Sequence, residues 1–199
     1  MPQEFFQILS QSAHDFQHIV WPIVNRFPIV GGGTLKPVEA VSEASFKDEL
    51  DLLAGIDAWQ IITNAPAIRG LASRVQWGPK PYNTFSIRYQ LPSGKPTEFS
   101  KRLTSIRNKD NGHLFPHLTI QAYLDSQSGN VLSCAAIKTE DLFAKAAMLA
   151  EGMALENNKN PSLYGTQTIG DGTTFMYISW DYLRFHDSLA PENIFTRDP

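Results

Sequence analysis

The chain has 199 residues, of which 42% are hydrophobic and 19% charged, a balance typical of a globular domain rather than a disordered or fibrous chain. No apolar run approaches the roughly 20 residues that span a bilayer, and the N-terminus lacks the features of a secretory signal, so we expect a cytoplasmic protein with no membrane partner. The lone cysteine, Cys134, excludes an intramolecular disulfide and any multi-cysteine metal site.

The net charge of −3 conceals two opposed segments. Residues 69–109 hold nine basic residues and one acid, Glu98, for a net charge of +8, whereas residues 39–57 hold six acids and one lysine, for −5. Charge runs are often only the solvated faces of a helix or a loop. Segregation this strong instead favours a phosphate-rich ligand, because like charges destabilise a fold unless something opposes them.

The first half of the chain predicts two helices followed by three strands. Apolar residues at helical spacing indicate an amphipathic helix over 3–27, which Pro22 should kink or divide. The glycine-rich segment 31–37 is expected to be a loop. A second, acidic helix is expected over 42–54. Alternation of apolar and polar residues then predicts strands over 56–63, 72–77 and 84–91.

The second half predicts a helix over 97–107, strands over 117–124 and 131–137, a long helix over 139–156 and a last strand over 173–180. A short helix or turn follows at 182–185, and the C-terminal tail is expected to be loose. This order indicates an α/β fold with a mixed central sheet flanked by helices. No linker divides the chain, so we expect one domain over 1–199, with an N-terminal helix and loop (1–40) and a core (42–180).

Polar residues stand out in the first two predicted strands. Gly55, Ile56 and Asp57 lead into the first strand, and the second strand carries Arg74 and Gln76. Side chains two residues apart on a strand share one face. If the strands pair as a hairpin, Asp57 lies beside Arg74 and Gln76. The plainer alternative is a structural salt bridge between Asp57 and Arg74.

Residues 42–76 resemble the core motif of the PD-(D/E)xK nuclease superfamily, which has the restriction-endonuclease-like fold. By position, Glu49 resembles the acid of its first core helix, Asp57 its metal-binding aspartate, and Arg74 with Gln76 its two-apart pair. The resemblance implies that Asp57 and Glu49 bind Mg²⁺ or Mn²⁺ and that these four residues hydrolyse phosphodiester bonds in DNA. Many nucleases of this kind are dimers, so it also implies a homodimer as one arrangement.

The basic residues after the motif are expected to face DNA, namely Arg88, Lys95, Lys101 and Arg102. The pair itself departs from the family, because neither residue is acidic and neither is lysine. Arginine can stabilise phosphate charge, and glutamine can orient water or offer one neutral metal ligand. A second hypothesis therefore stays open, a non-catalytic module on this fold that binds nucleic acid or a protein.

Overall fold

The computed structural model describes residues 2–38, 55–62, 67–156 and 160–197. The helix expected over 42–54, and with it Glu49, lies outside the described residues.

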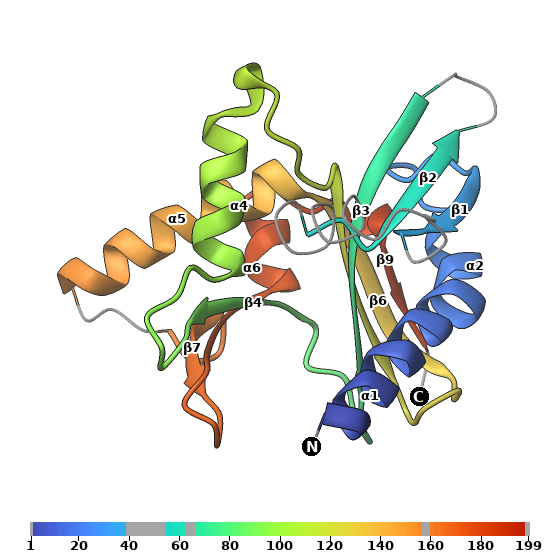
Figure 1. Cartoon of the computed structure of the whole chain (residues 1–199), viewed down its shortest axis with the longest axis horizontal. Helices are drawn as coiled ribbons and strands as arrows, with labels where there is room; N and C mark the ends of the chain where they lie inside the picture. The colour runs from blue at the N-terminus through green and yellow to red at the C-terminus, as the bar shows by residue number, and fades with distance from the viewer. Residues whose placement is uncertain (1, 39–54, 63–66, 157–159, 198–199) are drawn as a thin grey trace.

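A mixed six-stranded sheet forms the centre of the molecule (Figure 1). Strands β3 and β5 pair in parallel, and every other neighbouring pair in this sheet is antiparallel. The predicted α/β class with a mixed sheet is thus confirmed, while the restriction-endonuclease-like arrangement stays a prediction. In spatial order the strands are β1 (Thr34–Pro37), β2 (Ala58–Ile62), β3 (Ala67–Trp77), β5 (Leu118–Leu124), β6 (Val131–Lys138) and β9 (Ile194–Thr196).

A second, three-stranded antiparallel sheet contains β4 (Thr84–Gln90), β8 (Thr174–Ser179) and β7 (Tyr164–Thr168), in that order. Phe85 and Ile87 on β4 are buried, whereas the alternating Ser86 and Arg88 are less so. The alternation that predicts β4 and β8 is therefore real, but it does not reveal that they leave the central sheet. We call this the small sheet and the six-stranded one the large sheet.

The N-terminal segment covers one face of the large sheet (Figure 1). It forms α1 (Pro2–Asp15), a π-helical turn η1 (Phe16–Val20) and α2 (Trp21–Val24). Proline is tolerated in the first turn of a helix because its missing N–H has no partner there. Pro22 accordingly lies in the first turn of α2, and the π-helical turn η1 comes before this helix.

The other face of the large sheet packs against α4 (Glu98–Arg107), α5 (Thr139–Glu156), α6 (Trp180–Phe185) and the small sheet (Figure 1). Thr97 and Ser100 form a reciprocal capping box at the start of α4. Short 3-10 turns lie at Lys109–Asn111 and Pro191–Asn193. Within the described ranges, no helix combines the length and hydropathy needed to cross a membrane.

Candidate functional site

Asp57 lies where the chain enters β2, and the antiparallel pairing of β2 with β3 fixes its position. Its backbone N–H donates to the carbonyl of Leu71 at 2.8 Å. Its carboxylate accepts hydrogen bonds from the backbone N–H of Ser73 at 2.6 Å and from the Ser73 hydroxyl at 3.4 Å. The hairpin on which the expected placement of Asp57 depends is therefore present, and it holds the carboxylate against the residue that precedes Arg74.

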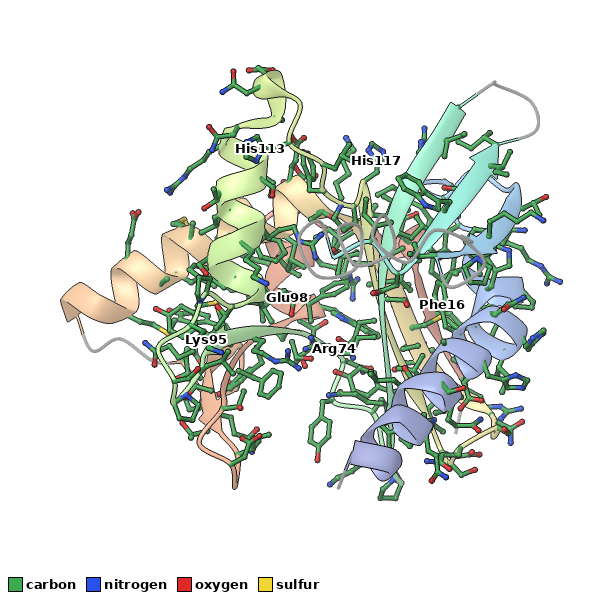
Figure 2. The ribbon with its side chains drawn as sticks, viewed as in Figure 1. Phe16, Arg74, Lys95, Glu98, His113 and His117 are labelled. Carbon is green, nitrogen blue, oxygen red and sulfur yellow. The ribbon has the colours of Figure 1, made fainter. Side chains whose placement is uncertain are left out.

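Arg74 points from β3 toward the small sheet and α4. One guanidinium nitrogen, Nη1, donates to the carbonyl of Ser86 at 2.6 Å and to its hydroxyl at 3.2 Å. The other, Nη2, forms an ion pair with Glu98 at 2.8 Å, and Figure 2 shows these two side chains between β3 and α4. Arg74 thus pairs with Glu98 rather than with Asp57.

Glu98 is the residue of this site that the sequence reasoning missed. It is the first residue of α4, and its Oε2 also accepts a hydrogen bond from the backbone N–H of Arg88 at 3.1 Å. One carboxylate therefore ties β3, β4 and α4 together. The available signal was its position as the one acid among nine basic residues.

Arg102 lies one turn after Glu98 on the same face of α4. Although expected on a DNA-facing surface, its side chain is buried, and the residue is only 6% exposed. Its Nη2 donates to the carbonyl of Gly55 at 3.2 Å. Burial lowers the pKa of Arg102, while the nearby carboxylates of Glu98 and Asp57 favour its charged form. Since arginine keeps its proton in proteins, a buried positive charge lies beside two acids.

Gly55 is required where it stands, because it permits the approach of Arg102. Its φ is +59°, and a Cβ atom there would lie 2.5 Å from Nη2 of Arg102. Any other residue would therefore be strained and would push the guanidinium away. The glycine of the Gly-Ile-Asp motif thus has a steric role next to the arginine.

Gln121 lies on β5 directly opposite Arg74 and is 2% exposed. Its Oε1 accepts a hydrogen bond from the Ser86 hydroxyl at 3.3 Å. Its Nε2 is buried and has no hydrogen-bond partner among the described residues. An unpaired buried donor is costly. The described residues therefore leave one hydrogen bond unmade among the polar groups around Arg74.

Gln76 lies farther along β3 and lines a cavity of about 690 Å³ over the small sheet. Arg88 is exposed on β4, and Lys95 is exposed on the loop before α4, to the left of Arg74 in Figure 2. Lys101 is half-buried on α4. The predicted site residues therefore divide into a compact group of Asp57, Arg74 and Arg102 and a set of more peripheral residues. We call Asp57, Arg74, Glu98 and Arg102 the Asp57 cluster.

No known protein family, curated protein or solved structure matches this chain. The resemblance to the nuclease superfamily accordingly stays a prediction.

Proposed function

We propose that this protein is a divalent-metal-dependent nuclease that hydrolyses phosphodiester bonds in DNA at the Asp57 cluster. The observation that carries the proposal is the meeting of two carboxylates and two arginine guanidinium groups at the junction of β2, β3 and α4. Phosphodiester hydrolysis needs a carboxylate to hold a cation and positive groups to face the developing charge. The cluster supplies both kinds of group.

Arg74 is suited to stabilise a phosphate that becomes more negative during the reaction. Its side chain is 27% exposed, and Ser86 and Glu98 fix its orientation. A guanidinium held in place needs no reorganisation when charge develops, which is the source of electrostatic catalysis. Arg102, buried behind it, adds positive potential and orients the loop that leads into Asp57.

Asp57 fits Mg²⁺ or Mn²⁺, because such ions take one or two protein carboxylates and complete their coordination with water and substrate phosphate. In the parts of the chain that the structure describes, no group of three or more acidic, histidine or cysteine side chains gathers. Glu49, proposed as the second carboxylate, lies outside those parts. When bound, the ion would lower the pKa of a water molecule and neutralise phosphate charge.

The same residues support a second candidate, a module that binds DNA without cleaving it. The specific observation is that the Glu98 carboxylate already balances the Arg74 charge at 2.8 Å. Arg88 and Lys95 are exposed and can contact phosphates independently of Asp57. In this case the salt dependence of DNA binding would survive the loss of the Asp57 carboxylate.

Nicking of supercoiled plasmid in Mg²⁺ or Mn²⁺ distinguishes the two candidates. We expect Asp57→Asn to reduce nicking at least about a hundredfold, since the amide is a poor metal ligand while still accepting a hydrogen bond from Ser73. Asp181→Asn is the matched control, because the Asp181 side chain is 83% exposed on α6. Wild-type protein that binds DNA in a salt-dependent manner but nicks with neither metal would favour the second candidate. Absence of both activities would reject both.

A further inference from the structure

The cavity over the small sheet has walls built from alternating residues of its strands. Ser86 on β4 lies opposite Tyr177 on β8, and Phe175 occupies the same face of β8. All three line the cavity, whose volume of about 690 Å³ falls in the usual range of small-molecule sites. The residues that alternate with them, Phe85 and Ile87 on β4 and Met176 and Ile178 on β8, are buried in the core, so the cavity-facing residues are not needed to fill it.

Two tyrosine rings at the cavity are held by neighbouring residues. Tyr82 is 74% exposed, and its ring meets that of Tyr123 edge-on at 6.2 Å. The Tyr123 hydroxyl is in turn fixed by donating to the carbonyl of Thr84 at 2.8 Å. The Tyr177 ring lies against Gly165 on β7, where a Cβ atom would come within 2.6 Å of its hydroxyl oxygen. The Tyr177 hydroxyl also donates to the carbonyl of Pro161 at 3.2 Å. The cavity thus offers the aromatic surface of an anchored ring, Tyr177, and of a largely exposed one, Tyr82.

Two carboxamides line the same cavity, those of Gln76 from β3 and Gln167 from β7. Neither side chain has a hydrogen-bond partner in the described part of the protein. Each carboxamide presents a donor beside an acceptor, the pattern that matches the hydrogen-bonding edge of a nucleobase. The tyrosine rings together with these two carboxamides therefore favour a flat ligand with hydrogen-bonding groups along its edge over an aliphatic ligand.

Positive charge adjoins this cavity. The guanidinium carbons of Arg74 and Arg88 lie 5.5 and 5.9 Å from the centroid of the Phe175 ring. Arg74 also donates to Ser86, so the cavity and the Asp57 cluster share a wall. A ligand in the cavity would have its ring near the tyrosines and any attached phosphate near the arginines.

We propose that this cavity is a nucleobase site that receives one unpaired base of a DNA strand. A base inside a duplex is stacked and paired and cannot enter a pocket, so the ligand is single-stranded DNA or an extruded nucleotide. Aromatic surface holds the base by stacking, and Gln76 and Gln167 contact its edge. The proposal deepens the proposed function by naming the form of its substrate, and it rests on that function only for the placement of the phosphates.

Fluorescence anisotropy with two short labelled strands tests the proposal without any cleavage. One strand carries natural bases and the other has abasic sites throughout, so the phosphates are the same. In EDTA we expect the natural strand to bind at least about fivefold more tightly, in line with the stacking of one base. Equal affinity for the two strands would overturn the proposal.

Two pairs of variants locate the effect. Tyr82→Ala should remove most of the preference for the natural strand, whereas Phe185→Ala, which removes an aromatic side chain from an 83% exposed residue on α6, should leave it unchanged. Gln167→Ala should weaken binding of the natural strand about threefold, as expected for one lost hydrogen bond, with the exposed Gln90→Ala as control. A preference that survives both cavity variants would place the base elsewhere and overturn the proposal.

The nucleobase site and the nuclease activity can be tested independently of each other. Asp57→Asn should retain the preference for the natural strand, since Asp57 does not line the cavity. A protein that prefers natural bases but never cleaves would keep the nucleobase site and reject the nuclease. A protein that cleaves plasmid but binds both strands equally would do the reverse.

Discussion

Two polar clusters lie on opposite faces of β3, and they differ in how completely the protein satisfies them. On the face covered by the N-terminal helices, the fully buried Asp15 accepts hydrogen bonds from Trp77 at 2.8 Å, from Gln11 at 2.7 Å and from the backbone of Ser128 at 3.1 Å. On the other face, Arg74 is 27% exposed, and the buried donor of Gln121 lacks a partner in the described residues. The Asp15 cluster is closed, because its hydrogen bonds are made within the protein, and it stabilises the fold. The Asp57 cluster, which contains Arg74, is open and leaves room for a ligand.

The largest effect on folding is therefore expected from the closed cluster. Asp15→Asn replaces a carboxylate oxygen by a donor that faces other donors, and we expect a loss of about 2 to 4 kcal/mol in the free energy of unfolding. Urea denaturation measures it, with the exposed Asp110→Asn as the matched control. DNA binding by the folded fraction should not change. A loss no larger than that of the control would mean that Asp15 does not stabilise the fold.

The contrast between the two clusters was only partly predictable from the sequence. Strand periodicity predicted strands over 56–63 and 72–77, and the placement of Asp57 beside Arg74 depended on their pairing as a hairpin. In the structure β2 pairs with residues 67–71 of β3, which lie before the second predicted strand. Strand periodicity thus did not predict the pairing itself. It could not show that Glu98 takes the ion pair of Arg74, because that contact joins a helix to a strand. The i, i+4 spacing of Glu98 and Arg102 shows a shared helix face but not that this face is buried.

Strand assignment failed where the pattern is short or polar. The segment expected as a loop over 31–37 contains β1, and the tail expected to be loose contains β9, which pairs with β6. Both strands are three or four residues long, so no alternation can be recognised in them. β7 reads Tyr-Gly-Thr-Gln-Thr, and it forms a strand because β8 supplies its hydrogen-bond partners.

An intermediate effect on stability is expected from Glu98→Gln, which removes the ion pair with Arg74 from the Asp57 cluster. Because both partners are partly exposed, solvent screens the ion pair, and we expect a loss of only about 1 kcal/mol in stability. Removing a negative charge beside Arg74 should strengthen DNA binding a few-fold at low salt, whereas nicking should fall because the guanidinium is less firmly oriented. Anisotropy and plasmid nicking measure the two effects.

Glu192→Gln is the control for that variant, since Glu192 is exposed in the 3-10 turn before β9. If Glu98→Gln and the control bind DNA equally well, the Arg74 charge does not contact DNA. If nicking by Glu98→Gln stays at the wild-type rate, orientation of Arg74 by the carboxylate is not part of the reaction.

The smallest effect on stability is expected from lowering the pH, which protonates His117. This residue lies at the end of the β3–β5 pair away from the cavity. Burial lowers the pKa of His117, with Arg69 and Lys138 adding to the shift and Glu140 opposing it. The unfolded chain therefore takes up a proton near pH 6.5, before the folded protein does. Stability from neutral His117 is complete above that pH and is lost as the pH falls toward the lower pKa of the folded state. This burial is only partial, and much of the residue stays in contact with solvent, so we expect a change below about 1 kcal/mol. Urea denaturation between pH 7 and pH 5 should show a shallower loss for His117→Gln than for wild type, with the exposed His113→Gln as control. Parallel curves for all three proteins would show that protonation of His117 does not change the stability of the fold between pH 7 and pH 5.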